Sequence, residues 1–156
     1  MTELGFNNLP RRAHRRPQTS DRVPHIQRDQ IPTGDIVQRL LLRISQLSNA
    51  RERDSRMAMP GVKAFWIPDD NACGPKTAFI DDHEFCHLHE TGTIHLTAPK
   101  QLRELLIDRG WAEQHIVAKA GIIADTLLLV YAPQDETEVE VVTWIVRQSL
   151  AFATGR

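Results

Sequence analysis

The segment from Glu84 to Leu96 constrains the fold most, because its side chains alternate in character along two stretches that a glycine separates. Successive side chains of a strand point to opposite faces, so His87 and His89 share one face. A three-residue loop that ends at Gly92, with this glycine in the left-handed conformation, brings His95 opposite His87 and keeps the apolar faces together. The sequence therefore predicts a hairpin with three imidazoles on one face. The other face carries the apolar side chains of Cys86, Leu88, Ile94 and Leu96.

The same alternation assigns the first residues of this hairpin. Phe85 has the parity of the histidines, so we expect it on the imidazole face. We expect Glu84 to face solvent or to support the turn. Cys86 faces the core and is predicted to be an inert buried thiol.

The remaining periodicity predicts helices and strands in an α+β order. Helices are expected at residues 33–49, 99–109 and 135–153, and strands at residues 62–67, 77–80, 111–118 and 126–132. The mixed-charge run at residues 51–54 is interpreted as a solvated helix end. Short connections favour an antiparallel sheet with the helices packed on one face, a two-layer α+β architecture. The helices should cover the face of Cys86, which leaves the imidazole face to a pocket or to solvent.

Composition excludes several classes of protein. The 156 residues carry a net charge of −1, which gives no overall case for nucleic acid or an anionic membrane as partner. No apolar run reaches the ~20 residues that span a bilayer, so we expect a soluble protein. Two cysteines, Cys73 and Cys86, in a chain without a recognisable signal peptide favour reduced thiols and a cytoplasmic location.

Residues 1–30 differ from the rest because arginines and prolines stand among few apolar side chains. This composition predicts a flexible basic N-terminal arm that builds no core, followed by a single α+β domain at residues 31–156. A partner-binding role for the arm is the alternative. Aromatic side chains do not alternate with the arginines, which makes nucleic acid an unlikely partner.

A second group of candidate site residues follows the glycine at position 110. Trp111, Glu113 and His115 share a parity, and we expect them on the same face as the hairpin histidines. Imidazoles act as acids, bases or metal ligands near neutral pH, and a neighbouring carboxylate can orient them. Trp111 could offer an apolar wall to a ligand, and Tyr131 is a further candidate for the pocket lining.

Three blocks of sequence resemble the fungal luciferase-like domain family. The first is Glu84-x-x-His87-x-His89 with the glycine and histidine that follow, and the second is the segment of residues 110–115. The third is Tyr131-Ala132-Pro133 with acidic residues after it, where Gln134 stands in place of the arginine usual in the family.

This resemblance implies a small-molecule enzyme. Fungal luciferases oxidise a hydroxy-pyrone luciferin with molecular oxygen, without a bound redox cofactor. By resemblance, the base and hydrogen-bond partners would be His87, His89, His95 and His115. Glu113 would orient His115, while Trp111 and Tyr131 would bind the substrate. The expected substrate is an enolic aromatic or pyrone-type molecule, and no metal or other cofactor is expected for this reaction.

Two alternatives remain open from the sequence. The same histidines, His87, His89, His95 and His115, could hold a transition metal such as zinc or iron. The chain could instead be a non-enzymatic binding module that works through its basic arm. The expected partners are a small-molecule substrate and molecular oxygen, no membrane is expected, and a homo-oligomer is left open.

Overall fold

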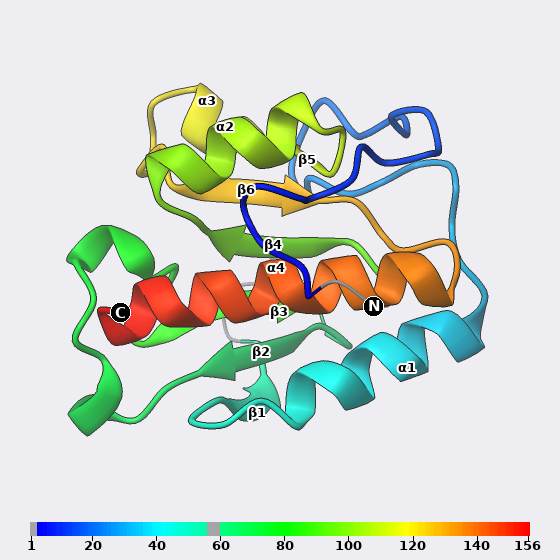
Figure 1. Ribbon diagram of the computed structural model, residues 1–156. Coiled ribbons are helices and arrows are strands. Elements are labelled where there is room, and N and C mark those ends of the chain that lie inside the picture. Colours follow the sequence, from blue (N-terminus) through cyan, green and yellow to red (C-terminus); the bar gives the residue numbers. More distant parts are fainter. Residues whose placement is uncertain (1–2, 56–59) are drawn as a thin grey trace.

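A computed structural model describes residues 3–55 and 60–156, and it places one antiparallel sheet against three helices (Figure 1). Its six strands run in the order β1-β2-β3-β4-β6-β5. The strands are β1 (Arg51–Asp54), β2 (Lys63–Trp66), β3 (Glu84–Leu88), β4 (Ile94–Thr97), β5 (Ala112–Gln114) and β6 (Leu127–Val130). The helices are α1 (Gly34–Ser45), α2 (Lys100–Asp108), the short α3 (Ile116–Lys119) and α4 (Glu136–Thr154). Helices α1, α2 and α4 cover one face of the sheet, which confirms the α+β fold class.

The hairpin of β3 and β4 has the predicted register. His87 pairs with His95, and Leu88 pairs with Ile94. The His89 amide donates to the Thr93 carbonyl at 2.9 Å, and Gly92 has a φ of +86°. A Cβ at Gly92 would lie 3.0 Å from the Cβ of Ala132, so both the backbone conformation and the space favour glycine here.

The hydrophobic core lies between the sheet and the three helices. Cys86, Leu88, Ile94 and Leu96 all belong to it, as the alternation predicts. Helix α4 lies along β3 and β4 on this face (Figure 1), and it begins where the Asp135 carboxylate accepts a hydrogen bond from the Glu138 amide. We call this side of the sheet the helix face, and the side with His87 and His95 the imidazole face.

A β-bulge corrects the assignment of the first residues of β3. Phe65 pairs with Cys86, but the next pair is Trp66 with Glu84, so Phe85 is the extra residue on β3. Phe85 therefore belongs to the core rather than to the imidazole face. Glu84 is fully buried, and the expectation of a solvent-facing carboxylate is wrong.

Three other segments differ from the sequence prediction. Residues 51–54 form the edge strand β1 rather than a helix end, since pairing with β2 satisfies their backbone groups. Residues 76–78 form a 3-10 turn instead of a strand. The strand expected at 111–118 ends at Gln114, because the next side chain, His115, caps α3 by accepting from the Val117 amide.

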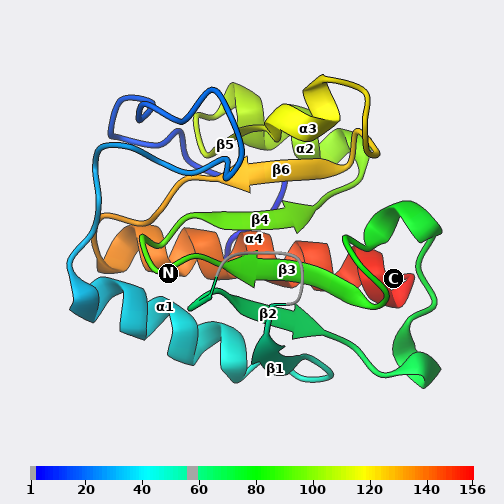
Figure 2. The same ribbon diagram turned by 180° about the vertical axis from the view of Figure 1, so that it is seen from behind.

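The N-terminal segment, residues 3–32, runs around the edge of the sheet at β5. Phe6 lies against Trp144 of α4 on the helix face, with 5.9 Å between ring centroids. Farther along the segment, the carbonyl of His25 contacts His95 on the imidazole face. Figure 2 shows the sheet from the imidazole side, with this segment beside β5 and β6.

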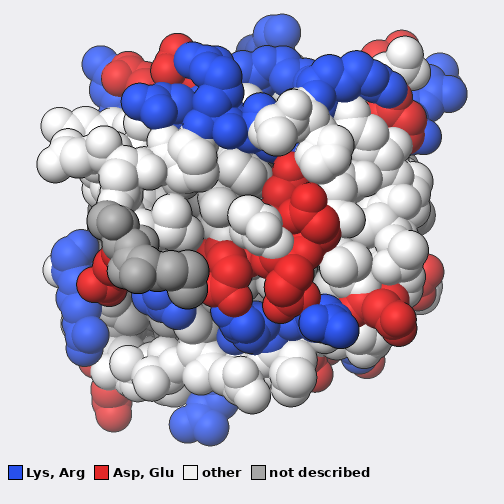
Figure 3. Space-filling view, turned by 45° about the vertical axis from the view of Figure 1, so that its right-hand side comes forward, with Lys and Arg blue, Asp and Glu red and all other residues white. Residues whose placement is uncertain are grey.

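The segment contributes to the core, contrary to the prediction from composition. Leu9 is 1% exposed and belongs to the hydrophobic core. Its arginines bind the body of the protein: Arg11 pairs with Asp108, and the buried Arg12 pairs with Glu138. Lys and Arg side chains gather along the edge of the molecule where this segment and α2 lie (Figure 3). Polar composition alone could not show these contacts, because each partner is about a hundred residues away in the sequence.

Within residues 3–55 and 60–156, no helix is long and apolar enough to cross a membrane.

Candidate active site

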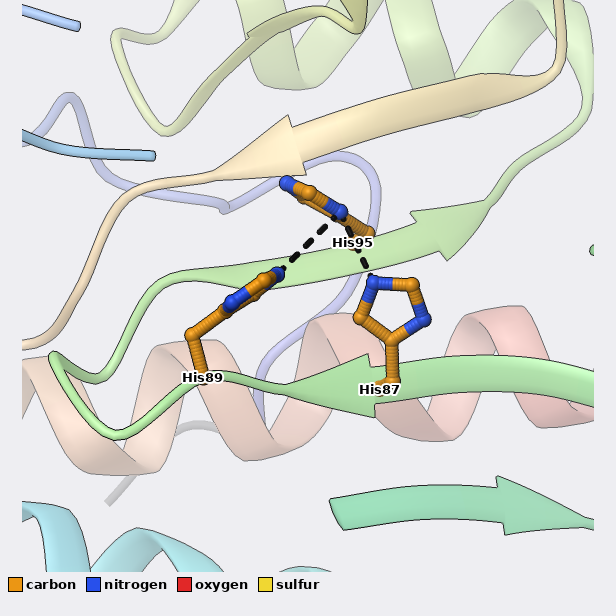
Figure 4. A group of neighbouring side chains, drawn as sticks. All are labelled: His87, His89 and His95. Atoms are coloured by element: carbon orange, nitrogen blue, oxygen red, sulfur yellow. Dashed lines mark hydrogen bonds between the residues drawn. The ribbon is translucent and has the colours of Figure 1, made fainter. Parts of the chain in front are cut away.

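Three imidazoles meet on the imidazole face of the sheet (Figure 4). His87 comes from β3, His89 follows that strand directly, and His95 comes from β4. His95 Nδ1 lies 2.8 Å from His87 Nε2 and 3.4 Å from His89 Nε2. All three side chains are buried. The register of the hairpin therefore produces the convergence that the alternation predicts.

Hydrogen bonds at the outer ends of two rings determine their orientation. His95 Nε2 donates to the backbone carbonyl of His25 at 2.5 Å, so Nδ1 of the neutral ring carries a lone pair. His87 Nε2 can then donate its proton to His95 Nδ1. On the far side of His87, Nδ1 lies 2.9 Å from a carboxylate oxygen of Glu84. A neutral His87 ring carries one proton, so it donates either to Glu84 from Nδ1 or to His95 from Nε2, and this row of contacts ends at the His25 carbonyl.

Glu84 is a site residue that reasoning from alternation missed. Its side chain is fully buried, and its Oε1 atom has no hydrogen-bond partner within the described residues. The bulge beside Phe85 turns it toward His87. The spacing Glu-x-x-His in the first sequence block was the available signal, but it does not reveal the bulge.

His115 adds a fourth imidazole to the group. Its ring lies edge-on to His95, with 4.4 Å between centroids. Its Nδ1 accepts from the Val117 amide at 3.1 Å, so in the neutral ring Nε2 carries the proton. His115 is thus a hydrogen-bond donor toward the neighbouring rings and the cavity.

Burial favours the neutral form of three of these rings, those of His89, His95 and His115. Burial, followed by the charges of His87 and His115, lowers the pKa of His89 to about 3. Burial also lowers the pKa of His115 to about 4 and that of His95 well below its ordinary value. Neutral imidazoles offer lone pairs to a proton or to a metal ion.

His25 is a second residue that the sequence did not indicate. Its Nδ1 accepts from the Ile116 amide at 3.1 Å, and its Nε2 donates to Glu113 at 3.2 Å. Its ring also lies against His115, with 5.0 Å between centroids. A histidine in a polar segment without periodicity carries no signal of such a position.

Glu113 binds partners other than the one expected. Its carboxylate accepts from Thr19 at 2.9 Å, from Tyr131 at 2.9 Å and from His25, rather than from His115. Burial alone would raise the pKa of Glu113, but these hydrogen bonds outweigh it and hold the pKa below its ordinary value. Because the His25 ring lies between β5 and His115, Glu113 orients the N-terminal segment instead.

Trp111 and Tyr131 lie away from the cavity. Trp111 is part of the hydrophobic core, and its indole donates to the Pro10 carbonyl at 2.7 Å. Tyr131 is buried with its hydroxyl on Glu113, and burial, with Arg16 opposing it, raises the pKa of Tyr131 to about 12. Both side chains hold the N-terminal segment in place. The apolar wall of the cavity, which they were expected to provide, comes from other residues.

The imidazoles lie at one side of a cavity of about 400 Å³. Its histidines are His25, His87, His89, His95 and His115, and its apolar lining comes from Val23, Pro24, Ile80, Val117, Ile123 and Leu127. Val23 and Ile123 are 62% and 41% exposed, so they stand at the mouth. The cavity combines an apolar wall with a few convergent polar groups, as small-molecule sites do.

Comparison with known proteins agrees with the sequence blocks. The family model of the Luciferase domain matches residues 82–149, which include every cavity histidine except His25. Over these residues the chain is similar to the Luciferase domain. It is 26% identical to a luciferase of Armillaria gallica over 165 residues, and 25% identical to one of Neonothopanus nambi. These alignments cover 95% of this chain and 62% of each relative, so the chain spans about three fifths of their length. No solved structure gives a significant match.

Proposed function

We propose that the protein is a small-molecule enzyme of the oxygenase type, acting on an enolic aromatic or pyrone-type substrate in the histidine cavity. The observation that carries the proposal is the apolar cavity with buried imidazoles along one side. The similarity to the Luciferase domain and to fungal luciferases supports it, because the resemblance of the sequence blocks implies oxidation of a small molecule.

The size and lining of the cavity suit a planar molecule of modest size. Its volume of about 400 Å³ lies within the range of small-molecule sites, ~300–1,000 Å³. Val23, Ile80 and Ile123 provide apolar surface around the imidazoles. Such a wall excludes water from a reactive anion, which reduces competing protonation.

The hydrogen-bond pattern suggests a separate role for each ring. His87 occupies the His95 Nδ1 lone pair at 2.8 Å, whereas His89 Nε2 stands farther away at 3.4 Å. We therefore assign His89 as the base that accepts the enol proton. His115, which carries its proton on Nε2, would donate a hydrogen bond to the enolate oxygen.

The proposed reaction conserves atoms and electrons. Transfer of the enol proton to His89 leaves an enolate and an imidazolium. The electron-rich carbon of the enolate forms a C–O bond to dioxygen, which is reduced by two electrons to the peroxide level. The proton then returns from the imidazolium to the terminal oxygen, giving a hydroperoxide and the starting base.

A panel of hydroxy-pyrones and enolic phenols tests the proposal. Ligand binding is followed by fluorescence, and oxygen uptake by an oxygen electrode. We expect His89→Ala to lower oxygen uptake by ~100-fold or more, in the range of lost general-base catalysis. His83→Ala is the matched control, because His83 pairs with Asp69 outside the cavity. A folded protein that binds no member of the panel, or uptake unchanged in His89→Ala, would contradict the proposal.

A further inference from the structure

We infer that His87, His89 and His95 form a binding site for one divalent transition-metal ion of the zinc or iron type. The site lies in the cavity of the proposed function, and the inference rests on that function only for the role of the ion in catalysis. Binding of the ion itself is measurable without any substrate.

The positions of the three nitrogen atoms support this inference (Figure 4). The His87, His89 and His95 ligand atoms all lie within 4.8 Å of one another, and two of the separations are 2.8 and 3.4 Å. Nitrogens ~2.1 Å from a tetrahedral ion are about 3.4 Å apart. The observed separations need only small ring movements to match this geometry.

The outer ends of the rings have the partners that metal-bound histidines require. Histidine ligands donate their second N–H to a carboxylate or a backbone carbonyl, which fixes the tautomer and orients the lone pair. His87 Nδ1 lies 2.9 Å from the Glu84 carboxylate, and His95 Nε2 donates to the His25 carbonyl. When His87 donates to Glu84 from Nδ1 and His95 donates to the His25 carbonyl from Nε2, the inward nitrogen of each ring presents a lone pair to an ion.

Glu84 supplies an independent argument. A fully buried carboxylate is costly unless a positive charge lies near it, and no Lys or Arg side chain pairs with Glu84 among the described salt bridges. One of its oxygens also lacks a hydrogen-bond partner within the described residues. A divalent ion on His87 would place positive charge one imidazole away from this carboxylate.

The fourth candidate ligand, His115, is better suited to another role. Its Nδ1 already accepts from the Val117 amide, so the neutral ring presents an N–H rather than a lone pair to the cavity. The site then has three protein ligands and an open position on the cavity side, as catalytic metal sites do. A bound ion would supply Lewis-acid activation of a substrate oxygen there, so in the metal-bound protein His89 would be a ligand, and the ion would promote loss of the enol proton in place of the free base.

The test uses the full chain, freed of metal with a chelator and then dialysed. Zn²⁺, and Fe²⁺ under anaerobic conditions, are titrated against a chromophoric competitor, and bound metal is counted by elemental mass spectrometry. We expect one ion per chain. Co²⁺ provides a spectroscopic check, because a tetrahedral imidazole site gives intense visible absorption bands.

Three variants show where the ion binds. We expect His89→Ala to abolish stoichiometric binding and Glu84→Gln to weaken it by ~10–100-fold, the usual effect of removing such a partner. His83→Ala should bind as the parent does, since His83 lies outside the cavity. Thermal unfolding of each metal-free variant shows that it is folded. Substoichiometric binding by the parent, or equal binding by His89→Ala, would overturn the inference.

Activity separates this inference from the proposed function. One bound ion without oxygen uptake on any panel substrate supports the metal site and counts against the oxygenase. Oxygen uptake by protein that never binds an ion supports the oxygenase and overturns the metal site.

Discussion

The two faces of the sheet are similarly buried, but different interactions bury them. On the helix face, apolar side chains such as Leu96 pack against three regular helices. On the imidazole face, His87 and His95 are 5% and 4% exposed under an irregular segment that hydrogen bonds hold in place. Burying apolar area stabilises a fold, whereas burying imidazoles and a carboxylate costs free energy unless each is paired. The helix face therefore contributes most of the free energy that stabilises the fold. Part of this free energy offsets the cost of burying the reactive cluster on the imidazole face.

The largest expected effect comes from the helix face. Leu96→Ala should lower the free energy of unfolding by ~2–5 kcal/mol, because it removes buried contacts and leaves a cavity. Urea unfolding followed by circular dichroism measures this loss. The folded fraction should bind Zn²⁺ as the parent does, since Leu96 lies on the opposite side of β4 from the histidines.

Leu42→Ala is the control for this comparison, because Leu42 is 57% exposed on α1. It should change the free energy of unfolding by only a few tenths of a kcal/mol. A loss in Leu96→Ala no larger than that of Leu42→Ala would show that the helix face does not provide most of the stability.

Next in size is the effect of releasing the N-terminal segment. His25→Ala leaves the Ile116 amide and one Glu113 oxygen without this partner, which should cost ~1–3 kcal/mol. The same change should speed proteolysis within residues 3–32, because His25 joins this segment to β5 and α3. Limited proteolysis with mass spectrometry measures it, and a cleavage rate equal to that of the parent would mean that the other contacts of the segment suffice.

The sequence could predict the helix face and the hairpin because both depend on local rules. Alternation placed Cys86 in the core, and Gly92 determined the loop and hence the pairing of His87 with His95. The polar contacts of the imidazole face depend on non-local events. A one-residue bulge brought Glu84 into the cluster, and a segment without periodicity brought His25. Composition describes what such a segment lacks, but not where its backbone carbonyls and the His25 imidazole will bind.

A smaller effect is expected at the beginning of α4, on the helix face. The Asp135 carboxylate accepts from the Glu138 amide at 2.8 Å, so Asp135→Ala should cost about 1 kcal/mol. Asp135→Asn is the matched control, because asparagine also caps helices, and it should lose much less. Urea unfolding measures both variants, and oxygen uptake and metal binding should remain unchanged. Equal losses in the two variants would attribute the effect to charge rather than to the cap.

The smallest effect at neutral pH concerns Tyr131, whose hydroxyl donates to Glu113 beside the imidazole face. It is the only tyrosine of the chain, so phenolate absorbance near 295 nm reports this residue alone. We expect a pKa of about 12 in the folded protein, against an ordinary value of 10.0. The raised pKa means that the stability contributed by the neutral phenol is fully present below pH 10 and is lost as pH rises from about 10 to 12.

The variant Glu113→Gln tests what raises the Tyr131 pKa. Burial is the largest cause of the raised pKa, and the Glu113 charge and hydrogen bond also raise it. The variant should therefore lower the Tyr131 pKa without returning it to the ordinary value, and it should leave the protonation of Tyr131 at pH 7 unchanged. A Tyr131 pKa at its ordinary value in the parent would show that water reaches this side of the sheet. Hydrogen bonds, rather than the exclusion of water, would then maintain the imidazole face.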